Sequence, residues 1–235
     1  MVNWFNTELG SCFTNEACAH VPSLIPYGYH GVALQIGATE QDLLANIDCG
    51  QRIYVAPGHG KLNGTQVCSD WDALPFERRS MDLVVLFHAL DFGKDPGGVL
   101  REVSEILAPE GHLVVLGLNP FGIWGICRLL KFHKSSMPWT ANYFPLTRVQ
   151  DWINLLGFVT VGGTMYFYRP PVNNESILRR LQFMESAGRR WWPALSGAYI
   201  LVAKNKALNI HAKHVKTVLR GVRQRHRLQT LTRKS

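Results

Sequence analysis

The chain has 235 residues, of which 46% are hydrophobic and 18% are charged. This balance excludes a disordered chain, and ordinary glycine, proline and cysteine contents exclude collagen-like and disulfide-dense classes. The net charge of +8 comes from one end, because residues 204–235 hold ten of the 25 basic residues and no acidic residue, which leaves 15 basic against 17 acidic residues elsewhere. The sequence therefore predicts a near-neutral globule with a basic tail rather than a uniformly basic nucleic-acid binder.

The patterns predict alternating strands and helices. In chain order, the predicted elements are a strand at 30–36, a helix at 41–46, strands at 52–55, 65–68 and 82–88, a helix at 96–107, a strand at 112–116, a helix at 146–156, a strand at 158–168, a helix at 176–187 and a strand at 198–203. Thr39 and Asp42 stand in a capping-box relation, which favours a helix start there. This alternation is typical of an α/β fold with a mostly parallel sheet.

Five cysteines occur without a C-x-x-C pair, so the sequence indicates neither a disulfide framework nor a paired-thiolate zinc site. The N-terminus lacks the basic start and apolar core of a signal peptide, and we therefore expect a cytoplasmic protein. Residues 111–130 are long and apolar enough for a membrane span, but an Asn-Pro pair and glycines interrupt them. We expect a buried strand, a turn and a short helix there, and no transmembrane segment.

The stretch 69–120 carries an ordered series of features: an aspartate, Leu-Pro-Phe, an apolar strand, leucine with an acid, a helix, Leu-x-Pro-x-Gly and a second apolar strand. It resembles the class I S-adenosylmethionine-dependent methyltransferases of the type 11 group, over about 32–204 of the chain. The arrangement also resembles a proteobacterial methyltransferase subgroup of uncharacterised function. The resemblance implies a Rossmann-like sheet with an antiparallel closing hairpin, S-adenosylmethionine as methyl donor, and an acceptor that the sequence does not identify.

In the family, the donor binds at the carboxyl ends of the first strands. The resemblance places Gln35, Gly37 and Ala38 at the donor-binding loop. Gly37 is the one glycine kept of three, and Gln35 replaces an acidic residue, so a simple tight turn is the alternative interpretation. At the end of the second strand, Ala56 stands where the family has an acid that binds the ribose hydroxyls.

A short connection is a further departure from the family. Nine residues separate Val55 from Thr65, fewer than a helical crossover between parallel strands usually needs. We therefore expect the helix between the second and third strands to be absent.

The remaining donor residues lie after the third and fourth strands. By resemblance, Asp70 accepts the adenine amino group, the amide of Trp71 contacts the ring, and Phe87 faces the methionine end. An Asx turn beside a core tryptophan is the alternative for the first pair. His88 is the candidate catalytic base, with a hydrogen-bonded rim histidine as the alternative, and Asp91 is expected to cap or orient.

The domain division follows from these assignments. Residues 1–30 are predicted to form an N-terminal cap, 31–204 the methyltransferase-like domain and 205–235 the basic tail. Residues 1–30 and 120–145 are expected to cover the substrate opening. Their aromatic side chains either favour a planar or apolar acceptor or simply roof the sheet; they are Trp4, Phe5, Trp124, Trp139, Tyr143 and Phe144.

The tail pattern allows three kinds of partner. Val215, Val218, Leu219 and Val222 form one helical stripe within basic residues, as in a basic amphipathic helix. RNA or DNA phosphates, an anionic membrane surface and a partner groove are all compatible with it, and so is a solvated terminus. The alternative function is a degenerate methyltransferase fold that acts as a non-catalytic binding module through this tail.

Overall fold

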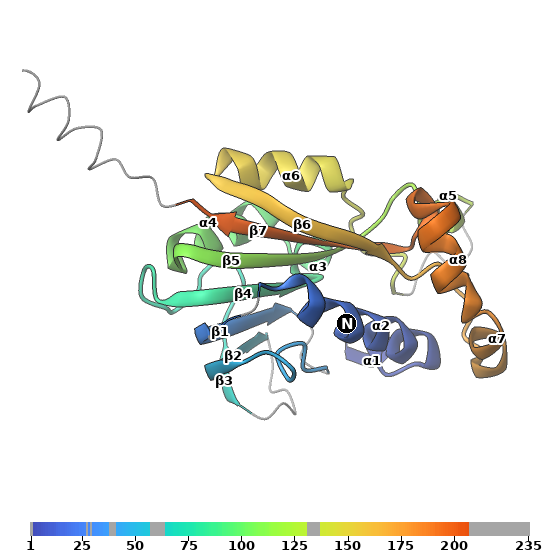
Figure 1. The fold of residues 1–235 in the computed structure, drawn as a ribbon, viewed down its shortest axis with the longest axis horizontal. Coiled ribbons are helices and arrows are strands. Elements are labelled where there is room, and N and C mark those ends of the chain that lie inside the picture. The colour runs from blue at the N-terminus through green and yellow to red at the C-terminus, as the bar shows by residue number, and fades with distance from the viewer. Residues whose placement is uncertain are drawn as a thin grey trace, which may run out of the picture.

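The computed structural model describes residues 2–26, 28, 30–37, 41–56, 64–130 and 137–206. They form a seven-stranded sheet in the order β3-β2-β1-β4-β5-β7-β6 (Figure 1). The strands are β1 (His30–Gly37), β2 (Cys49–Ala56), β3 (Thr65–Cys68), β4 (Met81–Phe87), β5 (Leu107–Leu118), β6 (Phe158–Tyr166) and β7 (Ala198–Asn205). The first five are parallel, and β7 runs antiparallel to both β5 and β6. The predicted fold class, with its antiparallel closing hairpin, is confirmed.

Both faces of the sheet are buried, which explains the continuous apolar runs. Along β4, Val85 and Phe87 belong to one core cluster, whereas Val84 and Leu86 belong to the other. The first face packs against the N-terminal helices α1 (Val2–Phe5) and α2 (Glu8–Leu24). The second packs against α4 (Pro96–Ile106) and α6 (Leu146–Leu155), with the short α3 (Ala89–Phe92) at its edge.

The remaining helices gather at the end of the molecule toward which the parallel strands run (Figure 1). They are α5 (Ile123–Leu129), α7 (Glu175–Arg180), α8 (Phe183–Trp191) and the short 3-10 helix η1 (Pro193–Leu195). The strand, turn and helix expected within 111–130 are therefore confirmed. The single helix expected at 176–187 is two helices, because the chain turns at Leu181 and Gln182.

The helix predicted at 41–46 is wrong, since these residues form successive turns. Asp42 Oδ1 accepts the amide of Leu44 at 2.9 Å and the hydroxyl of Tyr54 at 2.9 Å. A side chain that hydrogen-bonds its own backbone two residues on stabilises a turn instead of a helix. Thr39, the other half of the expected capping box, lies outside the described residues.

Two further predictions concern segments that lie wholly or mostly outside the described residues. The strands β2 and β3 pair in parallel although only residues 57–64 join them, and most of these lie outside the described residues. The amphipathic pattern of the basic tail also lies outside them. Among the described helices, none is long and apolar enough to cross a membrane.

Candidate functional site

The carboxyl ends of the parallel strands bring most of the predicted donor residues to one edge of the sheet. Gly37, the last residue of β1, pairs with Phe87, the last residue of β4, and His88 follows directly. Asp70 and Trp71 follow β3 at the same edge. Ala38 lies outside the described residues. Open α/β sheets bind ligands at this edge, so the geometry agrees with the expected location.

The side chain of Gln35 holds the turns at 41–46, where the sequence had predicted a helix. Its Nε2 donates to the carbonyl of Gln41 at 2.8 Å, and its Oε1 accepts the amide of Leu43 at 3.0 Å. Gln35 is fully buried. A buried amide must satisfy both its donor and its acceptor, so glutamine serves here where an acid would lack a donor.

Gly37 is required by the backbone of the neighbouring strand. Its φ is +126°, and a Cβ at this position would lie 2.1 Å from the carbonyl oxygen of Phe87. Only glycine tolerates both conditions. The close approach of β1 to β4 therefore accounts for this glycine without a ligand contact, and the contact with a donor stays a prediction.

A pocket of about 250 Å³ opens beside Asp70 and Trp71. Its lining comes from the loop after β3, the end of α3, the loop that follows it and the first turn of α4, namely Ser69, Asp70, Trp71, Asp72, Phe92, Gly93, Lys94, Asp95 and Val99. Small-molecule pockets span roughly 300–1,000 Å³, so this space suits a base-sized group but not a whole nucleoside derivative.

The charged side chains that line the pocket give it a preference for one kind of ligand. Three aspartates and one lysine line it, which favours a ligand that presents hydrogen-bond donors or positive charge. Asp70 is exposed, whereas Trp71 is buried in the second core cluster. The indole Nε1 of Trp71 has no hydrogen-bond partner in the described part of the chain.

His88 joins a buried polar chain instead of an open site. Its Nδ1 lies 2.7 Å from Asp91 Oδ2, and its Nε2 lies 3.3 Å from the hydroxyl of Tyr166. The imidazole is 1% exposed, and the backbone of His88 is left-handed, with φ of 54°. Because both ring nitrogens have partners and solvent is excluded, proton exchange with an acceptor requires the cover to open. The role of His88 as a base stays a prediction.

Asp91 is the centre of this chain. Its Oδ2 also accepts the amide of Leu118 at 3.0 Å, which links α3 to the end of β5. Burial raises the pKa of the Asp91 carboxyl, and the contacts with His88 and Leu118 oppose this. Burial likewise raises the pKa of Tyr166 well above its usual value, so the phenol stays protonated.

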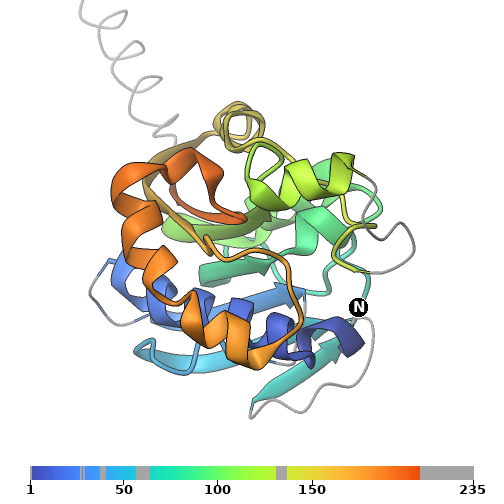
Figure 2. The same ribbon diagram turned by 90° about the vertical axis from the view of Figure 1, so that its right-hand side faces the viewer.

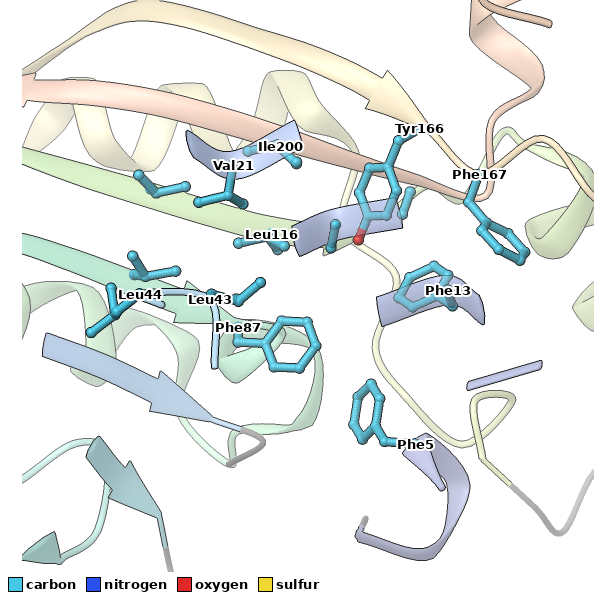
Figure 3. Packing of buried hydrophobic residues seen from close by; sticks show 14 of the residues in the cluster. Phe5, Phe13, Val21, Leu43, Leu44, Phe87, Leu116, Tyr166, Phe167 and Ile200 are labelled. Carbon is cyan, nitrogen blue, oxygen red and sulfur yellow. The ribbon is translucent and has the colours of Figure 1, made fainter. Parts of the chain in front are cut away.

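Aromatic rings from the N-terminal helices pack against Phe87 (Figure 3) and against the imidazole of His88. The Phe5 ring lies 5.2 Å from that of Phe87, and the Phe13 ring lies 5.3 Å from the imidazole. Figure 3 shows Phe5 and Phe13 on their helices turned toward Phe87 and Tyr166. The end of the site expected to hold a methionine group is therefore occupied by the protein's own side chains.

One buried ionic cluster was missed by the sequence analysis. Arg169, 4% exposed, contacts Glu185 through Nε at 3.1 Å and Glu16 through Nη2 at 2.5 Å. It joins α2, α8 and the segment after β6. Glu16 and Arg169 are 153 residues apart, so no local pattern could have paired them.

Comparisons with known proteins agree with the fold. Residues 45–115 match the model of a methyltransferase domain family. The uncharacterised protein YafS of Escherichia coli K12 is 32% identical over 146 residues, which cover 61% of this chain and 58% of that protein. The match to the family model confirms the resemblance to type 11 methyltransferases. The matched part covers less than two thirds of the length of YafS.

Two solved structures share the architecture at low identity. An S-adenosylmethionine-dependent methyltransferase from Thermotoga maritima superposes with a TM-score of 0.63 at 16% identity, over 87% of this chain and 94% of that one. The [4+2]-cyclase SpnF superposes with a TM-score of 0.57 at 13% identity, over 80% of this chain and 79% of that one. At these identities the likeness shows the fold alone, and one of these proteins is a methyltransferase whereas the other is a cyclase.

Proposed function

We propose that this chain, which carries a methyltransferase fold, transfers the methyl group of S-adenosylmethionine to an acceptor at the carboxyl ends of its parallel strands. The observation that carries the proposal is the pocket beside Asp70 and Trp71, the two residues to which the family resemblance assigns the adenine contact. Its size suits a purine, and its acidic lining suits an amino group.

When bound, S-adenosylmethionine supplies an electrophilic methyl group and a neutral thioether leaving group. The protein's part is then to align the acceptor and exclude water. Helices α1 and α2 exclude water from the strand ends, where Phe5 and Phe13 are buried. An acceptor that loses a proton needs a base, and the His88–Asp91 pair is the candidate nearest to the end of β4.

The alternative is a methyltransferase fold that no longer binds the donor and serves as a binding module. Specific contacts favour it: the Gln35 amide is used by a turn, and the Phe5 ring packs over Phe87. The side chain of Ala56, the last residue of β2, has no atom that could accept a hydrogen bond from a ribose hydroxyl. Donor binding would require Phe5 to move away from Phe87.

Calorimetric titration with S-adenosylmethionine separates the two functions. We expect Asp70→Asn to weaken donor binding about 10-fold, because asparagine keeps an acceptor oxygen but turns a charge-assisted hydrogen bond into a neutral one. Asp72 lines the same pocket, so a substitution there would also affect donor binding and cannot serve as the control. Asp48→Asn is the control, because Asp48 is exposed beside the opposite end of β2. Folded protein that gives no heat at millimolar donor would leave the binding module as the function.

A further inference from the structure

Large apolar side chains are exposed on α5, on α8 and on the turn before α5, and these elements lie at the end of the molecule that faces the viewer in Figure 2. We call Phe121, Leu129, Leu130, Phe183, Trp191 and Trp192 the end patch. Leu129 is 77% exposed and Trp191 is 71% exposed. Exposed apolar surface gathered on one side of a protein marks an interaction site more often than chance exposure.

The patch extends across separate elements that the backbone holds together. Asn119, at the end of β5, donates through Nδ2 to the carbonyls of Ala194 and Ser196 at 2.9 and 3.0 Å. These bonds fix the start of α5 against η1, which follows α8 directly. The views in Figures 1 and 2 agree that α5, α7 and α8 lie at this end. The elements that carry these apolar side chains are therefore held together by backbone-directed hydrogen bonds.

The exposed charges on the same helices are mostly positive. Helices α5, α7 and α8 carry five arginines, all exposed: Arg128, Arg179, Arg180, Arg189 and Arg190. Their two acids are Glu175 and Glu185, and Glu185 is buried against Arg169. The exposed groups thus amount to five positive charges and one negative charge. The guanidinium of Arg190 lies 5.8 Å from the centre of the Trp191 ring, so a positive charge and an exposed aromatic ring lie side by side at the end of α8.

We propose that the end patch docks on an anionic membrane surface. Tryptophan rings settle at the headgroup level of a bilayer, leucine and phenylalanine enter the acyl boundary, and arginines bind anionic headgroups. A nucleic acid would match the arginines but leave the leucines in water. The proposal concerns docking and does not depend on methyl transfer. If methyl transfer also occurs, the strand ends beside the patch would draw an acceptor from the bilayer.

Co-sedimentation of the full chain with lipid vesicles tests the docking. We expect binding to phosphatidylcholine vesicles that contain phosphatidylglycerol, and much weaker binding to phosphatidylcholine alone. Reversing two charges, Arg189→Glu with Arg190→Glu, should weaken binding on the order of 100-fold. Trp191→Ala with Trp192→Ala should weaken it at least about 10-fold and remove a blue shift of tryptophan emission. Leu155→Ala is the control, because Leu155 is 85% exposed on α6, outside the patch.

Three results would overturn the proposal. The first is no sedimentation with the anionic vesicles. The second is sedimentation that neither double variant changes, which would assign membrane binding to the tail. The third is a concentration-dependent dimer in sedimentation velocity that the tryptophan variant abolishes while vesicle binding persists, which would make the patch an interface between copies of the chain. Because no arm contains the donor, these results are independent of the calorimetric test of methyl transfer.

Discussion

Replacing Arg169 with methionine should lower the free energy of unfolding by about 3–5 kcal/mol, because it leaves the buried Glu185 and the half-buried Glu16 without their cation. Arg169 lies between Glu185, 3.1 Å from Nε, and Glu16, 2.5 Å from Nη2. Methionine retains most of the apolar stem, so the loss reports the charge and not a cavity. Urea unfolding monitored by circular dichroism measures the change.

The same variant should be more damaged at pH 8 than at pH 5. Burial and the neighbouring Glu16 raise the pKa of Glu185, and Arg169 lowers it. Without Arg169 the folded-state pKa rises further above the unfolded value, so the folded chain binds a proton more strongly than the unfolded chain. Stability then falls as pH rises from about 4.3, the value for an unperturbed glutamate, through the raised pKa.

Arg78→Met provides a matched control for this experiment. Arg78 contacts Glu105 at 3.1 Å, the distance of the Arg169–Glu185 pair, but its side chain is 80% exposed. An exposed pair contributes about 0.2–1 kcal/mol, with little dependence on pH in this range. Equal losses for the two variants would mean that burial does not strengthen the Arg169 cluster.

The comparison of these two arginines also shows where the sequence stops being informative. Arg78 lies in a charged stretch and Arg169 between aromatic residues and prolines, yet neither flanking sequence contains the acid Glu16 that pairs with Arg169. This partner comes from α2, 153 residues earlier in the chain. The burial of a charge is a property of the assembled layers, and a periodicity analysis cannot reveal it.

The sheet itself was predictable because its physics is local. A strand covered on both faces, such as β4, needs apolar residues throughout, and the sequence of 82–88 shows this directly. The helix expected at 41–46 failed for the opposite reason. Its residues have adequate helix propensity, but Gln35 and Tyr54, from the two adjacent strands, hold their backbone and side chains in turns.

The candidate site was predictable in part. Family resemblance located Asp70 and Trp71, which do line a pocket. The ring of Phe5 over Phe87 depends on how α1 returns to the sheet, and the link from His88 to Tyr166 joins residues 78 positions apart. Contacts of such separation decide whether a strand end is open, and they leave no mark on any local motif.

Replacing Asp91 with alanine should cost about 3–5 kcal/mol of unfolding free energy, because it breaks a buried pair and leaves its partners unsatisfied. The carboxylate contacts His88 Nδ1 at 2.7 Å and accepts the amide of Leu118 at 3.0 Å, and it is 1% exposed. Since a domain of ordinary stability has about 5–15 kcal/mol in total, the variant should be close to unfolding at room temperature. Denaturant unfolding measures the loss.

Asparagine at position 91 separates charge from hydrogen bonding. Asp91→Asn keeps an oxygen for the Leu118 amide, and we expect a smaller loss of about 1–3 kcal/mol. Asp151→Ala, at an exposed position on α6, should change stability by no more than about 0.5 kcal/mol. If Asp91→Ala were as mild as this control, Asp91 would not hold α3 to β5. If Asp91→Asn matched the alanine variant, the negative charge opposite His88 would be the main contribution, because the hydrogen bond to Leu118 survives in the asparagine variant alone.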